Sequence, residues 1–208
     1  MKGNTAPDVR RKPGRQPVDR REEILDAAQR LYDSIGFDKV TVGDVARELG
    51  MSPANLYRSF SSRQAIDEAV AARKLAVIDE AGWTAARDAH RDPEGAFRDL
   101  VLSVMRTSRH LLLSEERMHR LCAVATQNRW PVVEGFVRGM RGALRHIVIE
   151  GQHAGTFRSS DPDRTAGALI SALTKVWHPY MLDIYRHDDL EAEAASLCDL
   201  LLSGLKSE

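Results

Sequence analysis

The sequence has 208 residues, of which 43% are hydrophobic and 29% charged, with 30 Lys and Arg residues against 30 Asp and Glu residues and only two cysteines. At about 100–200 residues per domain, this length fits one large domain or two small ones, and the apolar share excludes a chain that is disordered throughout. No run approaches the ~18 apolar residues of a membrane helix, and the basic start lacks the apolar stretch of a secretory signal. Cys122 and Cys198 lack metal-ligand spacing, so the sequence predicts a reduced, cytoplasmic protein with no metal, cofactor or membrane partner.

The net charge of zero conceals an uneven distribution of charge along the chain. Residues 1–21 hold seven basic and two acidic side chains, residues 1–63 carry a net charge of +3, and the remaining residues carry −3. The zero total therefore does not exclude a nucleic-acid partner. Residues 1–17 combine three prolines and a basic cluster without hydrophobic periodicity, which predicts a flexible basic arm; a solvated tail without function is the alternative.

Three short helices are predicted after the arm. From Val18, apolar residues recur at helical spacing until Gly36, which is placed to end the first helix. Thr41 is a good N-cap for a second helix that ends at Gly50, and Ser52 followed by Pro53 is typical of the start of a third.

The rest of the chain also reads as helix, without a credible sheet. Apolar periodicity, prolines and glycines predict helices at about residues 63–91, 93–109, 111–128, 131–151, 162–178 and 190–205. Pro179 is expected to kink or end the fifth of these. The fold class is therefore all-α with about nine helices.

Residues 41–60 have the pattern of a helix-turn-helix. Ala46 is small where two helices cross closely, and Gly50, four residues later, suits the positive φ of the turn. Apolar residues at Val45, Leu49 and Leu56 allow the helix pair to pack on a neighbour. In such a motif the second helix projects its first turn into the major groove of DNA.

The segments Ile24–Phe37, Thr41-Val42 and Asn55–Phe60, followed by Arg63, resemble the TetR family of bacterial transcriptional repressors. The resemblance is specific over about residues 18–66 and rests on architecture beyond that. It implies a helix-turn-helix DNA-binding domain at residues 18–64 and a ligand-binding and dimerisation domain at residues 65–208. It further implies a homodimer on a pseudo-palindromic double-stranded DNA operator, released by an apolar or aromatic small molecule.

The resemblance and the physics of helix termini together predict the DNA-binding residues. Hydroxyls and backbone N–H groups at helix N-termini suit phosphates, Tyr57 matches a phosphate-binding aromatic of the family, and Asn55 suits adenine. The predicted set is Thr41, Val42, Ser52, Pro53, Ala54, Asn55, Tyr57, Arg58 and Arg63, with Arg10, Arg11, Lys12 and Arg15 from the arm. Family members commonly have Lys where this chain has Arg63. Simple helix capping is the alternative for Thr41 and Ser52, and a core position is the alternative for Tyr57.

The resemblance implies the ligand cavity, and the dimer follows from the resemblance together with symmetry, since two half-sites on one face of DNA need a two-fold partner. The predicted cavity residues are Trp83, Phe97, Met105, His110, Met118, Cys122, Trp130, Phe136 and Met140, for each of which ordinary core packing is the alternative. Arg129, His146 and His178 are candidate polar groups for orienting a ligand. The predicted dimer residues are Ile170, Leu173, Trp177, Leu190, Ala194, Leu197 and Leu201.

Two other classes of function remain open at this point. A DNA-binding adaptor would use the helical body to bind a protein instead of a small molecule. A helical enzyme is disfavoured because no nucleophile–base motif, glycine-rich phosphate loop or carboxylate pair occurs in a suitable context.

Overall fold

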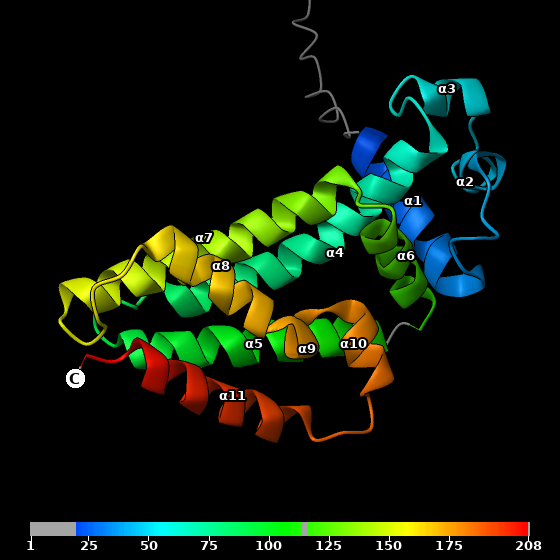
Figure 1. Ribbon diagram of the computed structural model, residues 1–208. Coiled ribbons are helices and arrows are strands. Elements are labelled where there is room, and N and C mark those ends of the chain that lie inside the picture. Colours follow the sequence, from blue (N-terminus) through cyan, green and yellow to red (C-terminus); the bar gives the residue numbers. More distant parts are fainter. Residues whose placement is uncertain (1–19, 114–115, 208) are drawn as a thin grey trace, which may run out of the picture.

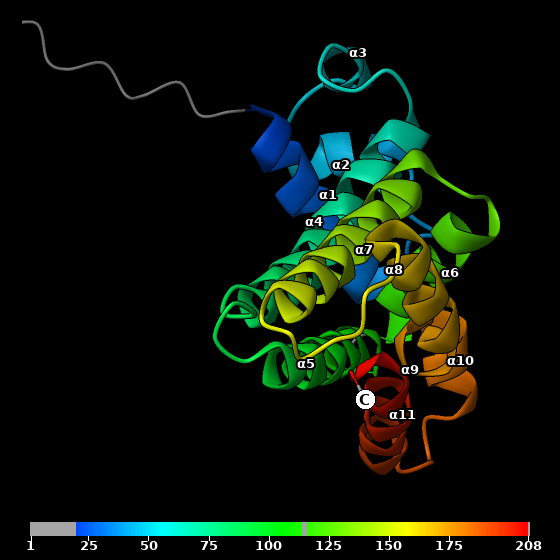
Figure 2. The same cartoon turned by 60° about the vertical axis from the view of Figure 1, so that its left-hand side comes forward.

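The computed structural model describes residues 20–113 and 116–207, without the side chains of residues 112–119. A small helical head carries α3 at its tip, and a larger helical body extends from it to α11 at the opposite end (Figures 1 and 2). The head contains α1 (Arg20–Ile35), α2 (Val42–Glu48) and α3 (Pro53–Tyr57). Helix α4 (Arg63–Ala86) leaves the head and continues into the body. The all-α fold class predicted from the sequence is confirmed for the described residues.

The body is built around α4, which packs mainly against α5 and α7. Its helices are α5 (Pro93–Leu113), α6 (Glu116–Gln127), α7 (Pro131–His153), α8 (Pro162–Ala172), α9 (Thr174–Trp177), α10 (Pro179–Ile184) and α11 (Leu190–Leu205). Among the described residues, none of these helices combines the length and the apolar character that a membrane crossing requires.

The caps predicted in the head are present. The Thr41 hydroxyl accepts a hydrogen bond from the Asp44 N–H at 3.2 Å, and the Ser52 hydroxyl accepts one from the Asn55 N–H at 3.3 Å. Gly36 and Gly50 adopt φ of +92° and +62°, so each ends a helix in a conformation that costs other residues free energy.

The described residues form eleven helices where the sequence predicted nine, because the predicted helix at 162–178 is divided into α8 and α9 and a further short helix, α10, follows it. Leu173 caps α8 with φ −79° and ψ 0°, so α9 begins with a change of direction. His178 then adopts an extended conformation ahead of Pro179, which opens α10. The restricted backbone before a proline explains this second break. Helix α4 also ends at Ala86 instead of Arg91, and α5 continues to Leu113.

Helix α11 is tied to the body along its length. Ion pairs join Arg106 to Glu191 at 2.7 Å, Lys175 to Glu193 at 2.6 Å and Arg98 to Asp199 at 2.6 Å. Exposed pairs contribute little to stability individually, so the main contribution comes from the apolar face of α11, in which Leu190, Ala194, Cys198 and Leu202 are buried. Near its end, the Arg158 N–H donates to the Leu205 carbonyl at 2.8 Å.

Buried apolar residues form a head core and a body core. The head core includes Ile24, Tyr32, Val45, Leu56 and Phe60, and it extends into α4, α6 and the start of α7 through Ile66, Val70, Ala71, Leu121, Ala125 and Trp130. The body core lies between α5, α7, α8 and α11. The head is therefore packed directly on α6, and no flexible linker separates it from the body.

The turn after α7 depends on a glycine. A Cβ at Gly151 would lie 2.1 Å from the Phe157 ring, whose side chain is buried and fixes the chain between α7 and α8. We expect Gly151→Ala to lower the free energy of unfolding by about 1–3 kcal/mol, because overpacking displaces the ring. Urea unfolding measures this. Gly135→Ala, with no such clash in the same helix, should be neutral or stabilising; equal losses in both variants would contradict the steric argument.

Candidate nucleic-acid interface and ligand cavity

The tip of the head presents its polar residues to solvent. Ser52, Pro53, Ala54, Asn55, Tyr57 and Arg58 are exposed. Tyr57 keeps 50% of its surface accessible, whereas Leu56 and Phe60 on the opposite side of the same short segment are buried. The helix therefore packs through Leu56 and leaves its first turn free, as insertion into a major groove requires. The alternative that Tyr57 is a core residue is wrong.

Thr41 and Ser52 differ in whether their hydroxyls already donate a hydrogen bond within the protein. The Thr41 hydroxyl donates to the Asp44 carboxylate at 2.7 Å, and its N–H donates to the same carboxylate at 2.9 Å. These hydrogen bonds, together with Arg47, lower the pKa of Asp44 to about 2. Thr41 is thus committed to its cap, whereas the Ser52 hydroxyl only accepts a hydrogen bond within the described chain. Ser52 is accordingly better placed to donate to a phosphate.

Arg63 is turned into the head. Its guanidinium donates to the Phe37 carbonyl and lies 3.5 Å from the Asp67 carboxylate. The Tyr32 hydroxyl donates to the other oxygen of Asp67, which is 6% exposed. Burial raises the pKa of Asp67, and burial together with the Asp67 carboxylate raises the pKa of Tyr32. Asp67 therefore joins α4 to α1, and Arg63 joins α4 to the chain that follows α1, in addition to any phosphate contact.

A second contact fixes the end of α3. The Arg21 side chain donates to the Ser59 carbonyl at 2.6 Å and lies over the Phe60 ring at 4.1 Å. This cation–π contact links the start of α1 to the end of the recognition segment. Arg21, Tyr32 and Asp67 were not predicted from the sequence, although the spacing of Arg63 and Asp67, one helical turn apart, was an available signal.

The remaining predicted DNA-binding residues are Val42 and four basic residues of the arm. Val42 is half-buried beneath the tip. Arg10, Arg11, Lys12 and Arg15 lie outside the described residues. The described interface thus consists of the N-termini of α2 and α3 with Tyr57 and Arg58.

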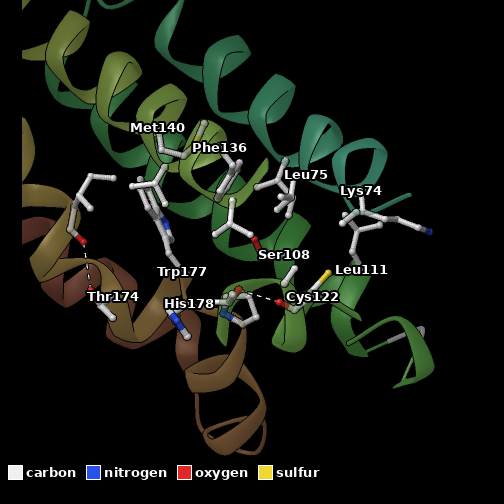
Figure 3. A pocket seen from close by; sticks show the side chains of 18 residues that line it. Lys74, Leu75, Ser108, Leu111, Cys122, Phe136, Met140, Thr174, Trp177 and His178 are labelled. Atoms are coloured by element: carbon white, nitrogen blue, oxygen red, sulfur yellow. Dashed lines mark hydrogen bonds between the residues drawn. The ribbon is translucent and has the colours of Figure 1, made fainter. Parts of the chain in front are cut away.

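A cavity of about 160 Å³ lies in the body beside the head (Figure 3). It is lined by Ala71, Lys74, Leu75, Ile78, Ser108, Leu111, Cys122, Ala125, Thr126, Val133, Phe136, Val137, Met140, Ile170, Thr174, Trp177, His178 and Pro179. Most of these side chains are apolar, which is typical of small-molecule sites. Among the described residues, no group of His, Cys, Asp and Glu side chains is arranged to hold a metal ion.

Three of the predicted cavity residues line this cavity: Cys122, Phe136 and Met140. Phe97 and Met105 are fully buried in the body, and Trp130 is buried in the head core. Trp83 is 40% exposed on α4, with its ring near His146, and His110 is exposed on α5. The side chain of Met118 lies outside the described residues. Of the other polar candidates, His178 lines the cavity.

The predicted dimer residues are placed mostly inside the protomer. Leu173, Leu190 and Ala194 are fully buried, and Ile170 and Trp177 line the cavity. Leu197 and Leu201 are half-buried. The apolar periodicity of α8 and α11 marked the faces that pack on the chain's own core, because such periodicity indicates burial without indicating which partner covers the face. Leu200, 68% exposed on the outer face of α11, was not singled out.

An exposed recognition helix on a head packed against a cavity-bearing helical body defines a helix-turn-helix regulator. The description "Bacterial regulatory proteins, tetR family" matches residues 24–70, and "Tetracyclin repressor-like, C-terminal domain" matches residues 93–198. The chain belongs to the TetR family. It is a DNA-binding transcriptional regulator, and the family is regulatory, not enzymatic.

Curated relatives and a solved structure are similar to the chain. The HTH-type transcriptional regulator TtgR of Pseudomonas putida is 24% identical over 76% of this chain and 79% of its own length. The nucleoid occlusion factor SlmA of Vibrio campbellii is 36% identical, but the match spans only 32% of this chain and 39% of SlmA. SmeT, the repressor of the Stenotrophomonas maltophilia multidrug efflux pump SmeDEF, is 18% identical over 90% of this chain and 91% of its own, with a TM-score of 0.62. SmeT has also been solved in complex with triclosan.

Because Tyr32 contacts Asp67, loss of its hydroxyl should affect the stability of the protein more than loss of the Tyr57 hydroxyl. Tyr32→Phe should lower the free energy of unfolding by about 1–3 kcal/mol, because it leaves one oxygen of the buried Asp67 carboxylate without its donor. Tyr57→Phe removes the same hydroxyl from an exposed ring and should leave stability unchanged. Chemical denaturation of both variants tests this. Equal stability of the Tyr32→Phe variant and the parent chain would show that the contact contributes nothing.

Proposed function

We propose that the chain is a dimeric repressor that leaves its operator when a small, largely apolar molecule fills the cavity. One observation carries this proposal: Ala71 of α4 and Ala125 of α6 line the cavity and also belong to the head core. A molecule that displaces either wall must therefore disturb the packing of the helices that hold the DNA-binding tip.

Helix α6 is the more direct of these two connections. Cys122 and Thr126 contribute to the cavity wall, while Leu121 is buried against the head. On its outer side the Arg120 guanidinium pairs with Asp38 at 2.5 Å, in the chain that connects α1 to α2. A shift of α6 would thus be transmitted to the head by packing and by an ion pair.

Thermodynamic linkage sets the size of the response. The inducer must bind more tightly to the conformation that does not hold the operator than to the conformation that does. The difference between its two binding free energies equals the free energy that it removes from operator binding. The triclosan complex of SmeT supports an apolar, aromatic ligand for a body of this fold. A cavity of about 160 Å³ favours a small molecule over the protein partner of an adaptor.

The proposed domain division follows the function, with residues 18–64 reading DNA and residues 65–208 binding the ligand and the second copy. The basic arm at residues 1–17 would add non-specific attraction to the adjacent DNA. Such a regulator meets its operator in the bacterial cytoplasm.

Repression and induction are tested with DNA from next to the chain's own gene. Gel shift on that DNA measures binding, and a reporter fused to the same promoter measures expression. Deleting the gene should raise reporter expression, and an inducer should do the same. A fall in expression on deletion would identify an activator, and failure to bind any specific DNA would reject the proposal.

Asn55 is expected to supply base recognition at the exposed first turn of α3. Asn55→Ala should weaken binding to the selected operator by about 1–3 kcal/mol, because its amide suits the edge of adenine. Binding to unrelated DNA should be unchanged. Asn128→Ala, an exposed residue at the end of α6, is the matched control. Fluorescence anisotropy measures both affinities; an equal loss on both DNA sequences would exclude base recognition.

A two-fold partner is proposed because one short recognition helix reads only part of an operator. The outer face of α11 offers Ser196, Leu200, Ser203 and Gly204, and α8 leaves Ala168, Ser171 and Ala172 exposed. In Figure 2, α11 lies at the end of the body remote from α3, and α8 lies between that end and the head. This placement lets two bodies join while their recognition helices remain free.

Leu200→Glu should dissociate this dimer at micromolar concentration, because it would bury an unpaired charge between the two copies. Analytical ultracentrifugation measures the mass. Val77→Glu introduces the same charge at an apolar residue of α4 that is 49% exposed, and that variant should remain dimeric. A dimeric Leu200→Glu variant would place the interface elsewhere.

A further inference from the structure

The cavity has the size of a single aromatic ring. Its volume is about 160 Å³, and an apolar cavity of about 150 Å³ in another protein accommodates benzene. Phe136, Met140, Ile78 and Leu111 supply apolar walls, and the Trp177 ring forms one side (Figure 3). The walls therefore suit a compact, flat and mostly apolar molecule.

Most polar groups in the wall already have a partner within the protein. The Thr126 hydroxyl donates to the Cys122 carbonyl at 2.8 Å, and the Thr174 hydroxyl donates to the Ser171 carbonyl at 2.8 Å. The Trp177 indole N–H donates to the Val101 carbonyl at 3.1 Å. These groups fix the wall and have no remaining proton to donate to a ligand.

Ser108 of α5 is different. Its side chain is 3% exposed, and within the described part of the chain its hydroxyl has no hydrogen-bond partner. Figure 3 shows its oxygen in the middle of the lining residues, between Trp177 and Leu111. Because this hydroxyl lines the cavity, it can donate to or accept from a ligand there, so a ligand hydroxyl that meets it is bound more tightly than an apolar group of the same size.

The charged and titratable groups of the wall favour a neutral ligand. Of the described residues that line the cavity, none is Asp, Glu or Arg. The Lys74 ammonium is directed away from Ser108 and Trp177 in Figure 3. His178 accepts a hydrogen bond from the Tyr180 N–H at its Nδ1 atom, and burial lowers its pKa, so its imidazole is neutral near pH 7.

We propose that the cavity binds neutral one-ring compounds that carry a single hydroxyl, the phenol class, and that Ser108 is the hydrogen-bond partner of that hydroxyl. The proposal rests on the function proposed above and specifies its ligand. The ring packs against Trp177, Phe136 and Met140, and the hydroxyl points to α5. Ser108 thereby becomes the residue that distinguishes a phenol from a hydrocarbon of the same shape.

Phenol and toluene test this directly, because they have nearly the same shape and differ in a hydroxyl against a methyl group. Isothermal titration calorimetry on the full chain without DNA should give tighter binding of phenol than of toluene, by about five- to tenfold for one hydrogen bond. Benzoate, which adds a negative charge to the ring, should bind more weakly than phenol.

Ser108→Ala should abolish the preference for phenol and leave the affinity for toluene unchanged, which also shows that the cavity is intact. Thr126→Val removes a hydroxyl that is already bonded to the backbone, and this control should retain the preference. An unchanged phenol-to-toluene ratio in Ser108→Ala, tighter binding of benzoate than of phenol, or binding of neither neutral ring would overturn the proposal.

The ligand class and the regulatory function fail separately in this design. Phenol that binds through Ser108 without releasing the operator in the gel shift would contradict the inducer role and leave the ligand assignment standing. Release of the operator by a compound that binds independently of Ser108 would support the inducer role and contradict the ligand assignment.

Discussion

Helix α4 is shared by two hydrophobic cores, and the rest of the molecule depends on this sharing. Its first half packs in the head through Ile66, Val70 and Ala71, and its second half packs against α5 and α7 in the body. At about 1.5 Å per residue, its 24 residues span about 36 Å. Because a close-packed interior transmits displacement, a change beside α4 or α6 cannot stay local to the cavity.

The DNA-binding tip is held by residues that do not themselves face DNA. Arg21 fixes the end of α3 from α1, and Asp67 joins Tyr32 to Arg63 beneath it. Helix α3 is only five residues long, so its own backbone hydrogen bonds cannot maintain it in water. Preorganisation of the recognition surface is therefore a tertiary property, although the residues that contact DNA are contiguous in sequence.

Local signals predicted the head well because its features depend on neighbours in the chain. Thr41 with Asp44, Ser52 with Pro53, and the glycines at 36 and 50 encode caps and turns within four residues. The cavity was predicted less completely, because apolar residues at helical spacing indicate burial without specifying against what. Phe97 and Met105 on α5 are buried in the body, while Ser108 on the same helix lines the cavity. A polar residue on an apolar helical face was the available signal for Ser108.

The sequence by itself determined the helix-turn-helix, its exposed first turn and the all-α class, since capping, turn and periodicity rules act over a few residues. Tertiary structure alone decided that Arg63 turns inward, that Ile170 and Trp177 line a cavity, and that Leu200 instead of Leu190 faces outward on α11. The physical reason is that a helix with apolar residues on several faces can pack in more than one orientation. Only contacts between residues far apart in the chain select one of them.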